Sequence, residues 1–229
     1  MYHQNMAKRP NASTRKRTTE ALDVLAAEKL QEVLNRFRIA QWDVVLVGDG
    51  SGNTWNAPCG WSAVLLDRQT RGRRVFFGAA NTGSINFAEL MPYLQALAWY
   101  DNNYGSDRIR KVGILQVHVI TDSQVIATEG NRVFAGERLP RSRALVWGSM
   151  TALRTCGYAI QFHWAPRATL GLNWMADCLA GLSRRTLIAA TKPPSLIELD
   201  TVIESVSNQP SLSHELRQRL DPYAINSDE

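Results

Sequence analysis

The stretch VVLVGDGS, from Val44 to Ser51, decides the fold class of this chain. Its first four residues form an uninterrupted apolar run, which is typical of a central strand buried on both faces of a sheet. Asp49 stands directly after this run. A carboxylate at the mouth of a buried strand is costly unless it is paired or bound to a ligand. Asp49 is therefore a candidate functional residue and not a packing residue.

Further apolar runs and periodic segments on both sides of this strand predict an α/β fold. Strands are expected at 61–66, 74–79, 115–121 and 158–164, and helices at 87–100, after Asp122, at 144–155 and at 173–187. The order β-β-β-α-β-α-β-α predicts a mixed sheet, in which an antiparallel meander precedes parallel strands reached by right-handed crossovers. Pro92 lies inside the segment 87–100, so this helix is expected to begin near Ala88 or later, or to be distorted there.

Charge and hydropathy divide the chain into four parts. Residues 1–17 carry five Lys or Arg and no acid, and are expected to be a disordered basic arm. Residues 18–40 contain an amphipathic helix with one apolar stripe, 42–190 form the main domain, and 191–229 form an acidic tail with a short helix. The amphipathic helix of residues 18–40 is expected to pack on the main domain or on a protein partner. The acidic tail is a second candidate for binding a protein partner.

The overall charge balance favours a polyanionic partner. The net charge is +5 and the sequence pI is about 9.3. A basic surface binds nucleic acid because each phosphate contact releases condensed counterions. The basic arm is expected to add nucleic-acid contacts of this kind to those of the main domain.

The sequence also argues against several classes of protein. No apolar run approaches the roughly 20 residues needed to cross a bilayer. The N-terminus lacks the apolar core of a secretory signal, which predicts an intracellular, cytoplasmic protein without membrane contact. The three cysteines, Cys59, Cys156 and Cys178, form no CxxC motif, so neither a disulfide framework nor a zinc site is predicted.

Four acidic residues stand where strands end or helices begin. Asp49 and Asp122 end strands, and Glu89 and Asp177 lie in the first turns of helices. Each one alone has an ordinary interpretation as a turn or helix-cap residue. In an α/β sheet, however, these positions converge on one edge. Clustered acids repel one another unless a hard divalent cation is bound, and oxygen-only ligands select Mg²⁺ or Mn²⁺.

Motifs around these acids resemble type 1 ribonuclease H over about residues 42–188. In chain order they are Asp49-Gly50-Ser51, Gly60-Trp61-Ser62-Ala63, Asn86 to Met91, Thr121-Asp122-Ser123-Gln124, Trp164, and Asn173 to Asp177. Both their order and their expected strand or helix context fit the family. The match is therefore far more specific than any single motif.

The resemblance implies a fold, an activity and a set of site residues. The fold would be the five-stranded ribonuclease H sheet with helices on both faces, extended here at both ends. The activity would be cleavage of the RNA strand of an RNA–DNA hybrid with two Mg²⁺ or Mn²⁺ ions. The residues implied as catalytic metal ligands are Asp49, Glu89, Asp122 and Asp177, and those implied as substrate contacts are Ser51, Asn86 and Gln124. Amide side chains can bond the 2′-hydroxyl and base edges of an A-like minor groove.

The chain departs from the family pattern at three places. The loop 165–171 lacks the family's mobile histidine, and Arg167 is expected to handle phosphate there; His163, just before it, is expected to face the sheet surface or core. The turn after the first acid is altered, so Asn56 is a displaced substrate contact. The basic segment of some members is shortened to 132–143, whose four arginines contact DNA phosphates or form a solvated loop.

Three functions from different classes fit this sequence. The first is hydrolysis of the RNA strand of hybrids, and the second is another nuclease of the same fold, such as a junction resolvase or an exonuclease. The third is a non-catalytic nucleic-acid-binding or assembly protein that retains the fold. The four acids favour a nuclease, because a protein without catalysis does not need them. Asn86 and Gln124 favour the hybrid substrate.

Overall fold

The computed structural model describes residues 12–52, 57–71, 73–139, 141–167 and 169–188. The strands are β1 (Val44–Ser51), β2 (Ala57–Asp67), β3 (Arg73–Gly83), β4 (Leu115–Thr121) and β5 (Tyr158–Trp164). The helices are α1 (Ala12–Arg36), α2 (Ile85–Tyr100), α3 (Ser106–Val112), α4 (Gln124–Phe134), α5 (Arg141–Thr155) and α6 (Gly171–Ile188), with a π-helical turn η1 (Asp101–Gly105) between α2 and α3.

The strands form one mixed sheet in the order β3-β2-β1-β4-β5. β1 and β3 both pair antiparallel with β2, whereas β4 pairs parallel with β1 and with β5. The predicted five-stranded mixed sheet, an antiparallel meander followed by parallel strands, is therefore confirmed. β1 is the central strand, and its carboxyl end lies beside the carboxyl end of β4.

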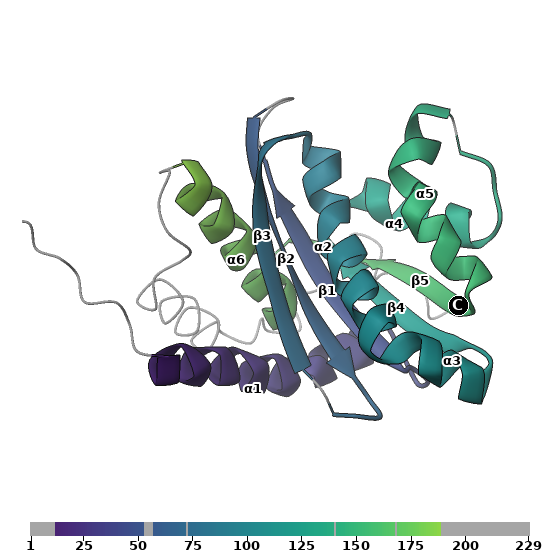
Figure 1. Cartoon of the computed structure of the whole chain (residues 1–229), viewed down its shortest axis with the longest axis horizontal. Coiled ribbons are helices and arrows are strands. Elements are labelled where there is room, and N and C mark those ends of the chain that lie inside the picture. The colour runs from purple at the N-terminus through teal and green to yellow at the C-terminus, as the bar shows by residue number, and fades with distance from the viewer. Residues whose placement is uncertain (1–11, 53–56, 72, 140, 168, 189–229) are drawn as a thin grey trace, which may run out of the picture.

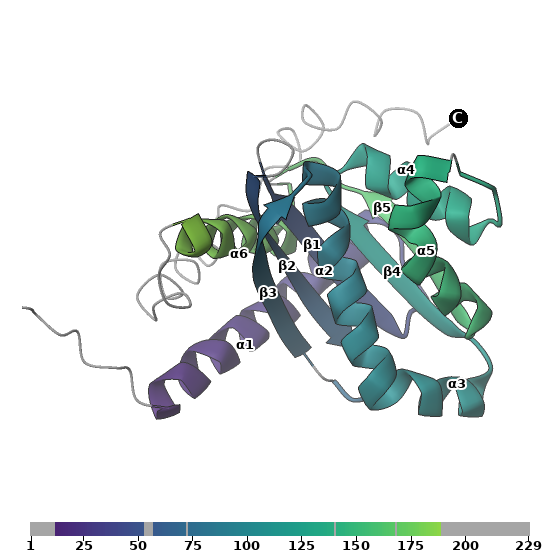
Figure 2. The same ribbon diagram turned by 45° about the horizontal axis from the view of Figure 1, so that its top comes forward.

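Helices cover both faces of the sheet (Figure 1 and Figure 2). Val44 and Leu46 of β1 pack into one apolar cluster with α2, α4 and α5. Val45 and Val47 pack into a second cluster on the opposite face, with α1 and α6. All four side chains are fully buried, as expected of a strand buried on both faces.

The helix α1 begins earlier than its sequence pattern predicted. It starts at Ala12, six residues before Thr18, so the end of the predicted basic arm is helical. Leu25, Ala26 and Val33 are buried against the sheet, so the second half of α1 packs on the main domain. Residues 1–11 of the arm and 191–229 of the acidic tail lie outside the described residues.

The start predicted for α2 is wrong. The helix begins at Ile85, because the Ser84 hydroxyl caps it by accepting a hydrogen bond from the Phe87 amide at 3.1 Å. Pro92 is consequently an interior residue of α2, and it is buried. η1 and α3, which the sequence pattern did not predict, then continue the chain towards β4.

None of the helices in the described part of the chain is both long and apolar enough to span a membrane.

Candidate active site

The end of β1 is shaped by two glycines that let α2 approach it closely. A Cβ atom on Gly50 would lie 2.4 Å from the Ala88 carbonyl carbon and 2.4 Å from the Glu89 amide nitrogen. A Cβ atom on Gly48 would lie 2.7 Å from the ring of Tyr93. Since neither glycine has a side chain, the first turns of α2 rest directly on β1. This contact brings Glu89 next to Asp49.

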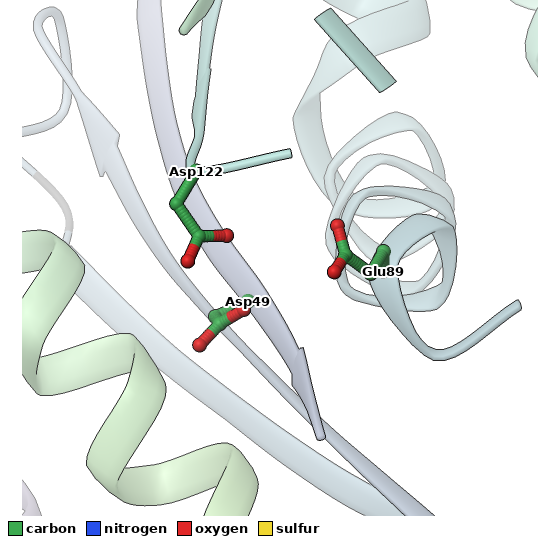
Figure 3. Close-up of side chains that lie close together, drawn as sticks. All are labelled: Asp49, Glu89 and Asp122. Carbon is green, nitrogen blue, oxygen red and sulfur yellow. The ribbon is translucent and has the colours of Figure 1, made fainter. Parts of the chain in front are cut away.

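Asp49, Glu89 and Asp122 form an acid cluster at this end of the sheet. One carboxylate oxygen from each lies within 4.8 Å of the others. Asp49 comes from β1, Glu89 from α2, and Asp122 directly follows β4, the parallel neighbour of β1. Figure 3 shows the three carboxylates directed towards a shared space. Carboxyl ends of parallel strands meet at one edge, which accounts for this convergence.

A buried tyrosine and a half-buried tryptophan hold the acid cluster in place. The Tyr93 hydroxyl lies 2.8 Å from the carbonyl oxygen of Gly48 and 3.0 Å from that of Ile120. It therefore links β1 one residue before Asp49 to β4 two residues before Asp122. The Trp164 indole N–H donates to the backbone carbonyl of Asp122 at 3.0 Å. Tyr93 was not predicted from the sequence, although its position one helical turn after Glu89 is a usable signal.

The electrostatics of the cluster favour a bound cation. Burial, followed by repulsion from Asp122 and Asp177, raises the pKa of Asp49 to about 9. Burial likewise raises the pKa of Glu89 to about 7, although a hydrogen bond from Ser123 opposes the rise. Asp49 Oδ2 and Glu89 Oε2 are buried without a hydrogen-bond partner. Buried carboxylate oxygens in this state are good ligands for a hard divalent cation.

Asp177 lies beside the acid cluster and is linked to it by Arg167. The Arg167 guanidinium hydrogen-bonds Asp122 Oδ2 at 3.0 Å and lies 3.6 Å from Asp177 Oδ1 and 3.9 Å from Asp49 Oδ2. The group of three close carboxylates does not include Asp177. The positive charge of the guanidinium thus offsets part of the negative charge of all three carboxylates. Arg167 is 60% exposed, so its guanidinium is also accessible from outside the protein.

The polar residues predicted as substrate contacts flank the acid cluster. Asn86 is exposed on the first turn of α2, Gln124 is exposed at the start of α4, and Ser51 is half-buried at the end of β1. Asn56 lies outside the described residues. Arg132 pairs with Glu137 through a 2.6 Å contact, so one arginine of the 132–143 segment already has an acidic partner.

His163 lies on the sheet and away from the acid cluster, as its position in a strand predicted. It faces the side of the sheet that α1 covers, where its ring packs against Phe37. Its Nε2 lies 2.9 Å from Nδ1 of His118 on the neighbouring strand. His118 and His163 are the histidines of the described part of the chain, and neither lies in the loop 165–171.

Comparisons with known proteins define the fold. No protein-family model matches the chain, and a search of the curated proteins found no match. LC11-RNase H1, isolated from compost by a metagenomic approach, is similar in structure with a TM-score of 0.50 and 17% identity, over 65% of this chain and 99% of its own. This chain therefore has a ribonuclease H-like fold. Similarity at 17% identity shows the fold and not the activity.

Other solved structures of the same kind are similar to the chain. LC11-RNase H1 in complex with an RNA/DNA hybrid has a TM-score of 0.49 and 17% identity, covering 63% of this chain and 99% of its own. The N-terminal RNase H domain of a Mycobacterium tuberculosis protein has a TM-score of 0.46 and 19% identity, covering 66% of this chain and 99% of its own.

Proposed function

We propose that the protein is a metal-dependent ribonuclease H, an endonuclease that hydrolyses the RNA strand of RNA–DNA hybrids with two divalent cations. The observation that carries the proposal is the acid cluster. Three carboxylates from β1, α2 and the end of β4 share one space, and two of their oxygens are buried without a hydrogen bond. A ribonuclease H-like fold places this cluster at the sheet edge where active sites of α/β proteins form.

The residues of the cluster fit Mg²⁺ or Mn²⁺. Its three members offer only oxygen ligands, which select hard cations over zinc or copper. Asp49, Glu89, Asp122 and Asp177 would hold the cations, and the first three of them form the close group of ligand oxygens. When bound, such ions activate water and stabilise the leaving oxygen in phosphodiester hydrolysis. The protein contributes fixed carboxylates on rigid elements and a partly buried setting.

Arg167 has a role of its own in this proposal. Its guanidinium carries a fixed positive charge, lies beside the acid cluster and is largely exposed. Guanidinium groups bind phosphate oxygens through paired hydrogen bonds. Arg167 would therefore orient the scissile phosphate and stabilise the charge that develops on it. It would not act as a general base, because arginine stays protonated.

Amide side chains near the cluster suit the hybrid substrate. Asn86 lies three residues before Glu89 on the same helix, and Gln124 lies two residues after Asp122. Both are exposed, and amides can donate to and accept from a 2′-hydroxyl and the base edges of a wide minor groove. Ser51, and Asn56 in the altered turn, would add contacts on the β1 side. These residues would distinguish the RNA strand from DNA.

A cleavage assay tests the proposed function directly. The full chain is incubated with an end-labelled RNA–DNA hybrid in Mg²⁺ and, separately, in Mn²⁺, and parallel reactions contain duplex DNA, duplex RNA, a four-way junction and single strands. We expect internal cleavage of the hybrid's RNA strand only. Intact RNA in both metals at high enzyme concentration would refute the proposal. Preferential cleavage of the junction, or removal of terminal nucleotides, would assign a different nuclease activity to the same cluster.

Replacing Arg167 tests its contact with phosphate. We expect Arg167→Ala to lower kcat for hybrid cleavage by about a hundredfold, the usual effect of losing one donor to developing charge. Arg167→Lys should retain more activity, because it keeps the charge but loses the paired geometry. Steady-state kinetics of both variants provide the measurement, with exposed Arg110→Ala on α3 as the matched control. Equal kcat values for Arg167→Ala and the control would remove Arg167 from the mechanism.

A further inference from the structure

The hairpin that joins β2 to β3 is strongly basic. Arg68, Arg71, Arg73 and Arg74 are all exposed, and none of them forms an ion pair with a carboxylate that the structure describes. The nearest acid in the sequence, Asp67, is buried and has other partners. It accepts hydrogen bonds at 2.8 Å from Tyr100 and from Arg108. The positive charge of the hairpin is therefore available to an outside partner.

A pocket lined by aromatic rings opens beside this hairpin. It has a volume of about 410 Å³ and lies between the start of β3 and the end of α2. Its lining includes Arg73, Arg74, Phe77, Trp99 and Tyr104. The Arg74 guanidinium lies 4.3 Å from the centre of the Trp99 ring. Tyr104, which is 42% exposed, meets Trp99 edge to face with ring centroids 5.7 Å apart.

This surface combines exposed aromatic rings with arginines that have no carboxylate partner among the described residues, so it fits a ligand that carries both flat rings and negative charge. Aromatic rings offer stacking surfaces to nucleic-acid bases, which all have a π face, and arginines bind phosphates. A protein strand rich in acids would satisfy the arginines but leave the rings exposed. A free nucleotide would occupy the pocket but leave most of the hairpin without a partner. A nucleic-acid strand uses both parts of the surface.

We propose that this hairpin and pocket form a second nucleic-acid site, which binds single-stranded nucleic acid. One base would stack on Tyr104, beside the Trp99 ring that Arg74 covers, and the neighbouring phosphates would contact Arg73, Arg74 and the rest of the hairpin. A single strand is required because the bases of a duplex are stacked inside it and do not reach a pocket of this kind.

The second site is separate from the acid cluster. Glu89 stands near the start of α2 and Trp99 near its end, ten residues later, which corresponds to about 15 Å along the helix. In Figure 1 and Figure 2 the hairpin lies beside the end of α2, at the end of the sheet opposite the one that carries the cluster. The site therefore goes beyond the proposed hydrolysis. It would hold a single-stranded segment that flanks the cleaved duplex.

Binding measurements without metal test this inference independently of cleavage. Fluorescence anisotropy follows the full chain binding a short labelled oligothymidylate in EDTA. We expect Tyr104→Ser to weaken binding by at least about fivefold, from the lost stacking. Arg73→Ala/Arg74→Ala should make the dependence of log affinity on log salt shallower by about 1.4, or 0.7 for each lost phosphate contact. The control is Arg110→Ala/Lys111→Ala on α3, which removes the same amount of positive charge from residues that do not line the pocket. It should change the salt dependence less.

Three outcomes would overturn the second site. The first is wild-type affinity in Tyr104→Ser, with circular dichroism showing that the variant is folded. The second is an equal change of salt slope in the two double-alanine variants. The third is polyglutamate displacing the oligonucleotide equally well from wild type and from Tyr104→Ser, because that result would mark the surface as a general polyanion site. Loss of hybrid cleavage in any of these variants has no bearing on the assignment.

Discussion

Asp49→Asn should abolish hybrid cleavage, lowering kcat by about three orders of magnitude or more, while making the metal-free protein more stable at pH 8. The loss follows because Asp49 is the most buried member of the acid cluster, at 4% exposure, and would be a ligand of the catalytic cation. The gain follows because Asp49, whose pKa in the folded protein is about 9, has to take up a proton when the chain folds at pH 8. A neutral amide removes that cost. The gain in stability should therefore grow as the pH rises from 5 to 8.

The pH dependence of stability follows from the same residue. In the folded protein the pKa of Asp49 is about 9, whereas an aspartate in the unfolded chain has a pKa of about 4. The folded state therefore binds the extra proton between these values, and metal-free stability falls as the pH rises from about 4 to 9. Mg²⁺ should restore stability at the upper end of this window.

Thermal unfolding at pH 5 and pH 8, in EDTA and in Mg²⁺, measures both effects. The wild type should melt lower at pH 8 than at pH 5 in EDTA and gain from Mg²⁺, whereas Asp49→Asn should lose most of both dependences. Asp107→Asn, at an exposed position on α3, is the control. If Asp49→Asn cleaved the hybrid as fast as the wild type, or melted at a lower temperature than the wild type in EDTA at pH 8, this account of the cluster would be contradicted.

Gly50→Ala should damage both stability and activity, although it adds a single methyl group. The new Cβ would lie 2.4 Å from backbone atoms of Ala88 and Glu89, so the whole start of α2 has to move. Overpacking of this kind costs about 1–3 kcal/mol, and backbone contacts are at the upper end. Moving Glu89 by about 1 Å should also lower kcat by about a hundredfold.

Gly52→Ala provides the matched control two residues further along the chain. A Cβ atom there would make ordinary contacts, the nearest at 3.5 Å from Cys59. Urea unfolding monitored by circular dichroism, together with kcat for hybrid cleavage, compares the two variants. Gly52→Ala should resemble the wild type. If Gly50→Ala were as stable and as active as Gly52→Ala, the close contact between β1 and α2 would not determine where Glu89 lies.

Local sequence patterns were sufficient to predict the sheet and the three members of the acid cluster. The apolar run Val44 to Val47 has no polar face, so it predicted a strand buried on both sides. Asp49 and Asp122 each follow a buried strand, and parallel neighbours end at the same edge of a sheet. These predictions rest on patterns of a few adjacent residues. The parallel pairing of the two strands is enough to place these two acids, which are far apart in the sequence, next to each other.

The features that the sequence did not predict depend on contacts between distant residues. Arg167 and Asp122 are 45 positions apart, and only the folded chain shows that the arginine pairs with acids. The pocket at Trp99 likewise needs the β2–β3 hairpin and the end of α2 in one place. The early start of α1 was missed because residues 12–17 are polar and charged and carry no apolar stripe.

Binding of Mn²⁺ by the full chain, followed by electron paramagnetic resonance of the free ion, tests the central claim most directly. The acid cluster is expected to bind Mn²⁺ in the wild type, and Asp49→Asn and Glu89→Gln should each weaken that binding by at least about tenfold. Asp107→Asn should bind as the wild type does. Equal Mn²⁺ affinity in all four proteins would show that these buried carboxylates do not hold the cation, and the proposed hydrolysis would lose its foundation.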